Sequence, residues 1–194
     1  MTTETTEPRG DETDKTARTV GQLVKYSREV NQSDTVEEVS AYALEGTVNL
    51  MDGHPSPTVV EVHQGDLRVM KSMSPHMESG GEPDAAARRA YETGKIVVVT
   101  DDPAKVSSRG DEVVLLEPEA FDDEYSTAAV SIAAPSVYRD EVREVGVIIS
   151  AMWPALESVE EYHVKPLDYL ADHVATAINN IRSRDRLERA RNDL

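Results

Sequence analysis

The chain contains no cysteine, and it has only one phenylalanine and one tryptophan. Without a thiol it has no disulfide, thiolate zinc site, iron–sulfur cluster or cysteine nucleophile. No apolar run approaches the roughly 20 residues that a membrane helix needs. The Thr- and Glu-rich start also lacks the basic and then apolar order of a signal peptide. The sequence therefore predicts a soluble cytoplasmic protein that does not contact a membrane.

Basic residues are scarce as well. Asp and Glu number 37 against 20 Lys and Arg, which gives a net charge of −17 and a pI near 4.6. The acidity belongs to the folded part, because residues 1–18 hold five acids and three bases. Such a surface repels nucleic acid and anionic lipid, so we expect no direct nucleic-acid partner. The excess of 14 arginines over 6 lysines resembles the composition of haloarchaeal proteins, whose self-repulsion is screened by strong salt.

A length of 194 residues predicts one domain with tails. Residues 1–18 lack apolar periodicity and are expected to be disordered. Apolar residues at helical spacing begin at Val20, and a capping box of Asp34 and Glu37 opens a second helix that runs to about Met51. We assign residues 19–183 to the domain and residues 184–194 to an extension of its last helix.

The middle of the chain alternates strand and helix patterns. Strands are expected at 58–63, 67–73, from 96, 113–116, 128–138 and 144–152, with helices at 85–93, where Gly94 ends the helix, and from 164 to the end. This order predicts an α+β fold, in which a central antiparallel sheet has its helices packed on one face and long helices at both termini.

Three stretches carry a resemblance to a known family: Gly81–Pro103, Tyr125–Met152 and His163–Ile181. In this order they resemble a GAF domain over residues 19–183. The sequence of these stretches is most similar to that of GAF domains from haloarchaeal regulators related to the bacterio-opsin activator. A helix-turn-helix usually follows in those regulators, whereas this sequence ends at Leu194. The resemblance therefore implies a regulatory module and does not extend to DNA binding.

GAF domains bind cyclic nucleotides, tetrapyrroles, haem, small metabolites or nothing, so the resemblance leaves the cofactor unknown. The Asn-Lys-Phe-Asp-Glu set that accompanies cyclic-nucleotide binding is absent. Bilin attachment and the sulfoxide reductases of this fold use cysteine, which the chain lacks. The chain is therefore not expected to bind cyclic nucleotides, to attach a bilin or to reduce a sulfoxide.

The expected ligand contacts are residues in segments that border the cavity of the resembled fold: Tyr91, Asp101, Tyr125, Ser131 and Trp153. Each has a structural alternative. Asp101 lies in an Asp-Asp-Pro sequence that is ordinary for the turn after a strand, and the three aromatics are equally consistent with rim packing. Ser131 lacks a G-x-S-x-G elbow and an evident base, so we predict no catalytic residue and no enzyme.

Soft donors gather at Met70, Met73, His76 and Met77, a set that suits Cu(I). However, Met70 and Met73 fall on opposite faces of the expected strand, and methionine commonly fills irregular apolar gaps. The other histidines show no spacing typical of metal ligands. We therefore predict no metal site.

The final segment, Ile181–Leu194, is the one stretch with a positive net charge. Its apolar residues Leu187, Ala190 and Leu194 follow the spacing of a helix–helix seam. We therefore predict a homodimer through the terminal helices, formed by a non-enzymatic module that binds a small ligand and signals to a protein partner. The alternative is a ligand-free dimerisation or protein-interaction module.

Overall fold

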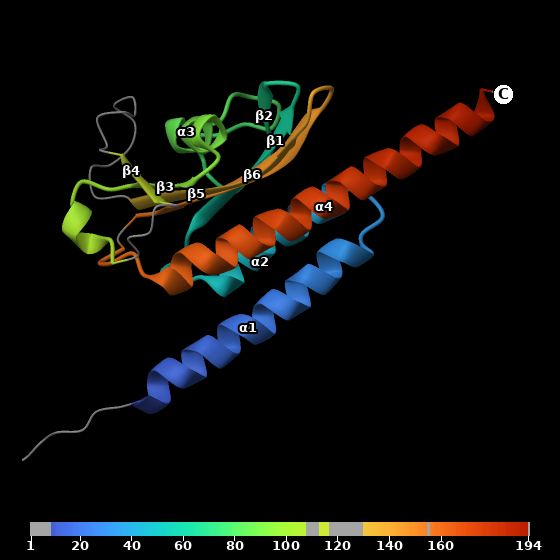
Figure 1. The fold of residues 1–194 in the computed structure, drawn as a ribbon. Coiled ribbons are helices and arrows are strands. Elements are labelled where there is room, and N and C mark those ends of the chain that lie inside the picture. Colours follow the sequence, from blue (N-terminus) through green and yellow to red (C-terminus); the bar gives the residue numbers. More distant parts are fainter. Residues whose placement is uncertain (1–8, 108–112, 117–129, 155, 194) are drawn as a thin grey trace, which may run out of the picture.

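The computed structural model describes residues 9–107, 113–116, 130–154 and 156–193 (Figure 1). Its centre is a sheet with the strand order β2-β1-β6-β5-β3-β4. The strands are β1 (Ser56–His63), β2 (Asp66–Ser72), β3 (Ile96–Val99), β4 (Val113–Leu116), β5 (Val130–Arg139) and β6 (Glu144–Trp153).

The five strands β1, β2, β3, β5 and β6 pair antiparallel with one another, as the sequence predicts. The short strand Val113–Leu116 also forms, but it runs parallel to β3 and pairs Ile96 with Val113. The predicted antiparallel sheet is confirmed for the other five strands, and β4 is an added parallel strand at its edge.

Two helices cover one face of the sheet, α2 (Val36–Leu50) and α4 (Glu161–Asn192), and a third long helix, α1 (Arg9–Gln32), packs against both of them on the side away from the strands (Figure 1). The predicted α+β arrangement with long terminal helices is confirmed. The short helix α3 (Ala85–Thr93) instead packs on the opposite face, so the expectation of a single helical face is incomplete. Alanines at 86, 87 and 90 let α3 lie close to that face, which is apolar as well.

Side chains alternate between the two faces of the sheet along each strand, so the core consists of two clusters, one on each face. On β5, Ile132 and Ala134 join the large cluster under the long helices, whereas Ala133 joins the smaller cluster under α3. Strand β3 is buried throughout, as its continuous β-branched sequence predicts. Among the described residues, no helix has the length and apolar character needed to cross a bilayer.

The N-terminal helices differ from the prediction in two places. Helix α1 begins at Arg9, so residues 9–18 are helical where disorder was expected. Pro8 immediately precedes the helix, and the residues after it include the strong helix formers Glu, Lys, Arg and Ala. The N-cap of α2 is Thr35 rather than Asp34, because Thr35 Oγ1 accepts the Glu38 amide at 3.2 Å.

Two glycines lie where a side chain would be unfavourable, and Gly94 has the role that the sequence predicts. Gly94 ends α3 in the left-handed region at φ 63°, and its amide donates to the Ala90 carbonyl. Gly146 lies where β6 approaches β5 closely. A Cβ atom there would lie 2.2 Å from the Ser136 carbonyl oxygen.

Candidate functional site

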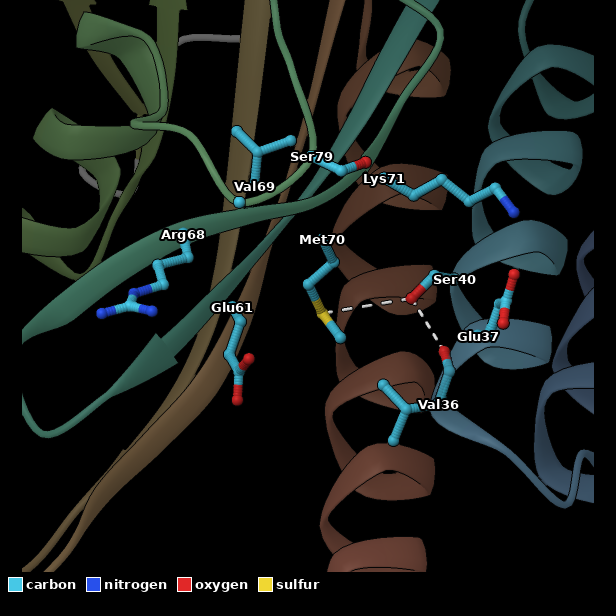
Figure 2. A pocket seen from close by; sticks show the side chains of 10 residues that line it. Val36, Glu37, Ser40, Glu61, Arg68, Val69, Met70, Lys71 and Ser79 are labelled. Atoms are coloured by element: carbon cyan, nitrogen blue, oxygen red, sulfur yellow. Dashed lines mark hydrogen bonds between the residues drawn. The ribbon is translucent and has the colours of Figure 1, made fainter.

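A cavity of about 440 Å³ lies between the first turns of α2, the middle of β1 and β2, and the loop after β2; we call it the α2–β2 pocket (Figure 2). Its size falls in the range of small-molecule sites. It is lined by Val36, Glu37, Ser40, Glu61, Arg68, Val69, Met70, Lys71, Ser79 and Gly80.

A β-bulge shapes the centre of this pocket. Val59 pairs with Lys71 and Val60 pairs with Val69, which leaves Met70 as the extra residue of β2. A bulge re-aims the side chain of the inserted residue, and Figure 2 shows Met70 pointing toward α2. There its Sδ lies 4.0 Å from the Ser40 hydroxyl. The thioether thus forms part of the pocket floor.

The loop after β2 closes the outer side of the pocket. Strand β2 lies at the edge of the sheet, but its backbone is paired near Val69. The Val69 amide donates to the Gly81 carbonyl at 2.9 Å, and the Gly80 amide donates to the Val69 carbonyl at 2.7 Å. This pairing fixes Ser79 and Gly80 beside the cavity and protects the strand edge.

The pocket combines an apolar floor with charges of both signs. Glu61 and Arg68 extend from the strands, while Glu37 and Lys71 lie on the α2 side (Figure 2). Two carboxylates and two cations around apolar atoms are complementary to a small amphipathic molecule that itself carries both charges. The Ser40 hydroxyl donates to the Val36 carbonyl at 2.8 Å.

The wall of the pocket is tied to the C-terminal helix. The Arg184 guanidinium donates to the Asp34 carbonyl at 2.7 Å, directly before the pocket-lining first turn of α2. Arg182 forms an ion pair with Glu61 of the pocket. Burial lowers the pKa of Arg182, and so does the nearby charge of Arg186. Movement of α2 or of Glu61 would therefore be transmitted to α4 through these two contacts.

Tyr91, one of the expected ligand contacts, belongs to a clamp between α3 and the β5–β6 hairpin. The Arg139 guanidinium lies 4.7 Å from the centre of the Tyr91 ring, donates to the Tyr91 carbonyl at 2.8 Å and pairs with Glu144 at 2.7 Å. The hydrogen bond with Glu144 raises the pKa of the Tyr91 phenol, as does partial burial. The structure gives this side chain a packing role.

Asp101 and Ser131 lie near one another, at the other end of the α3 face. Ser131 pairs with Val99, the last residue of β3, and it is buried. Asp101 follows two residues later, is exposed and forms an ion pair with Lys105 at 3.5 Å. Tyr125 lies outside the described residues.

Trp153 is on the opposite face from Tyr91 and Ser131. It is fully buried in the large cluster, and its indole Nε1 donates to the Asp52 carbonyl at 3.0 Å. Its ring meets the buried His163 edge-on, with the ring centres 6.1 Å apart. The structure therefore does not bring the predicted contacts together into one site.

The residues of the α2–β2 pocket were not predicted as ligand contacts. Met70 was considered only as a soft metal ligand, and the structure separates that set: Met70 packs under the long helices, Met77 packs under α3, and Met73 is largely exposed. Among the described residues, no cluster of His, Asp and Glu is arranged to bind a metal ion. An inserted residue has no sequence signature that would have revealed the bulge.

Comparisons with known proteins show the fold alone. No family model matches the sequence, and no curated protein matches it. Solved GAF domains do match its structure. The GAF domain of a phosphoenolpyruvate-protein phosphotransferase from Acinetobacter superimposes with a TM-score of 0.56 at 12% identity, over 87% of this chain and 97% of that one. The chain therefore has the GAF fold.

Two further neighbours differ in function. A GAF domain attributed to a sensor histidine kinase of Pseudomonas syringae pv. tomato gives a TM-score of 0.58 at 14% identity, covering 93% of this chain and 97% of that one. Free methionine-R-sulfoxide reductase from Neisseria meningitidis, solved with its substrate, gives 0.60 at 15% identity, covering 88% and 94%. The same fold thus occurs in a sensory protein and in an enzyme.

Proposed function

We propose that the chain is a cytoplasmic, non-enzymatic sensory or regulatory module. It binds a small molecule in the α2–β2 pocket and passes the signal through a dimer of its terminal helices to a protein partner. The observation that carries this proposal is the continuity of pocket and helices: the first turn of α2 lines the pocket, and Arg184 of α4 is bonded to Asp34, two residues before that turn. Sensory neighbours with this fold support it.

The dimer is proposed from the exposed face of α1. Val20 and Val24 are 54% and 65% exposed, and residues four apart share one face of a helix. Helix α4 continues past the domain, with Leu187 exposed (Figure 1). The strongly acidic composition and the excess of arginine support a salt-adapted regulator of the haloarchaeal type.

Native mass spectrometry tests the ligand. The protein is incubated with a low-molecular-weight cell extract, desalted and weighed without denaturation. The wild type is expected to retain a small-molecule mass. Ser79→Trp, which places an indole at the exposed edge of the pocket, is expected to lose it, whereas Glu78→Trp in the same loop does not line the pocket and keeps it.

A wild type that retains no mass would favour the second candidate, a ligand-free dimerisation or protein-interaction module. One observation supports that candidate. The α3 face, where the predicted contacts Tyr91 and Ser131 lie, is packed solidly in its described part, because Ala86, Ala87 and Ala90 are fully buried against the sheet. Asp101 and Ser131 remain proposed as contacts only for a ligand at the far end of that face.

A further inference from the structure

A groove of about 980 Å³ lies between the β5–β6 turn and the C-terminal half of α4. We call it the α4 groove. It adjoins the α2–β2 pocket, because Val36 lines both and the Arg182–Glu61 ion pair joins their walls. Its charged walls carry four arginines and two aspartates: Arg143, Arg182, Arg186, Arg189, Asp140 and Asp185.

The positive charge of the α4 groove contrasts with the rest of the molecule, whose net charge is −17. One of its two aspartates is already engaged. The Asp140 carboxylate accepts the amides of Val142 and Arg143 at 2.8 and 2.7 Å, so it caps the β5–β6 turn. Arg182 and Arg186 lie near enough that the charge of Arg186 lowers the pKa of Arg182. Asp140 stays charged in this turn, so the four guanidinium groups and two carboxylates of the lining leave an excess of two positive charges, and Arg182 shares its charge with Glu61.

The arginines of α4 form a row. Residues 182, 186 and 189 are spaced by four and three, so they share one side of the helix over about 10 Å of its axis. The Arg186 Nε donates to the Arg182 carbonyl at 3.2 Å, which aligns its stem with the helix. A row of this length matches about three residues of an extended polypeptide at ~3.3 Å each.

The opposite wall of the groove adds apolar surface. At the β5–β6 turn, Val142 is 85% exposed and Tyr138 is 57% exposed. The Arg143 guanidinium lies 5.7 Å from the centre of the Tyr138 ring and donates to Asn179 Oδ1 at 3.0 Å. Its buried Nε has no hydrogen-bond partner among the described residues. This Nε is buried and therefore not open to a ligand, but the groove sets guanidinium groups beside apolar side chains.

This combination selects one class of ligand. A phosphate or other small anion would contact only part of a row of arginines and would leave the apolar wall uncovered. Long nucleic acid would be repelled by the acidic surface around the groove. An extended segment with both acidic and apolar side chains satisfies both walls, because carboxylates pair with guanidinium groups in bidentate geometry.

We propose that the α4 groove binds an extended acidic and apolar segment of a protein partner. This inference rests on the proposed function, since it names the chemistry of the partner that receives the signal. It also suggests how the pocket and the partner are coupled, because Arg182 faces the partner segment while its ion-pair partner Glu61 faces the small ligand.

Fluorescence anisotropy with a labelled peptide of about eight alternating Glu and Leu residues tests the groove. The full chain is expected to bind this peptide, and Arg186→Glu is expected to weaken binding at least about fivefold. Arg191→Glu is the matched control, because it makes the same charge change on α4 outside the groove lining. It is expected to change binding less than about twofold, and a Gln-Leu peptide is expected to bind far more weakly.

Three results would overturn the inference: no binding of the acidic peptide, equal weakening by Arg186→Glu and Arg191→Glu, or equal binding of the Gln-Leu peptide. Displacement of the peptide by inorganic phosphate would reduce the groove to a small-anion site and also overturn it, as would tighter binding of duplex DNA with the same Arg186 dependence. Native mass spectrometry and sedimentation of the Arg186→Glu variant keep the proposed function separate. If the peptide does not bind but the protein still retains its small ligand and still dimerises, only the proposed role of the groove is overturned.

Discussion

At Gly146 the close approach of two strands leaves no room for a side chain. A Cβ atom there would lie 2.2 Å from the Ser136 carbonyl oxygen and 2.6 Å from the Val137 Cα. Both atoms belong to the backbone of β5, so the clash cannot be relieved by a rotamer change. Gly146→Ala is expected to destabilise the protein by about 3 kcal/mol or more, because the two central strands must separate. Urea unfolding followed by circular dichroism measures this change.

Gly21 provides the matched control for that substitution. It lies within α1, and nothing is within 4 Å of its added Cβ. Gly21→Ala is expected to stabilise the protein by about 0.5–1 kcal/mol through helix propensity. Equal midpoints for the two variants would contradict the close approach of β5 and β6.

His163 links the stability of the fold to pH. The imidazole is buried, its Nδ1 accepts the Glu160 amide at 3.0 Å, and burial lowers its pKa below the usual value. The unfolded chain protonates this histidine near pH 6.5. As the pH falls below that value, the unfolded state takes up a proton that the folded state binds more weakly, so stability is lost. The loss ends once the pH is below the folded pKa.

Comparison of wild type with His163→Gln measures this effect. Between pH 7.5 and pH 5.5 the wild type is expected to lose up to about 1.4 kcal/mol more stability than the variant. Carboxylates titrate in both proteins, so their contribution cancels in the difference. Identical pH profiles of the urea midpoint would show that His163 is not buried in its neutral form.

At the scale of elements, the exposed apolar residues of α1 argue for a second copy. Val20→Asp with Val24→Asp places two carboxylates on the proposed interface and is expected to weaken the dimer at least about tenfold. Sedimentation equilibrium measures the dissociation constant. Met73→Asp is the control, because Met73 is equally exposed, at 55%, but follows β2 and belongs to neither terminal helix. A wild type that is only monomeric would refute the dimer.

The elements themselves were largely predictable from the sequence, because periodicity and capping are local signals. Helix Ala85–Thr93 and strand Val113–Leu116 have the predicted bounds. The direction of that strand and the face on which α3 packs were missed, since both depend on tertiary pairing rather than on local pattern. The start of α1 was missed because residues 9–18 have almost no apolar side chains and hence no apolar periodicity.

The candidate site was less predictable, because it arises where elements meet. The predicted contacts Trp153 and Tyr91 lie on opposite faces of the sheet, although both are aromatic residues near element ends. The α2–β2 pocket depends on one inserted residue, Met70, and on a loop that pairs with the strand edge. Resemblance to a known fold predicts where segments of the chain lie, but it does not predict which cavities stay open between them.

The net charge of −17 affects the stability of the whole molecule. Self-repulsion opposes compaction in dilute buffer, and salt screens it over a Debye length of about 3 Å at 1 M. Raising KCl from 0.1 to 2 M is expected to increase the melting temperature by about 4–8 °C, which corresponds to about 2 kcal/mol for a chain of this size. Differential scanning calorimetry measures the shift, with chloride chosen because sulfate also strengthens apolar burial.

A variant with fewer charges separates screening from other effects of salt. Asp66, Glu141, Asp172 and Glu188 are exposed acids on four different parts of the surface, and converting them to the matching amides removes four negative charges without touching the core. Self-repulsion grows faster than linearly with net charge, so the salt-induced rise in melting temperature should shrink in this variant. An undiminished rise would mean that salt acts through apolar burial, and the acidic composition would then need another explanation.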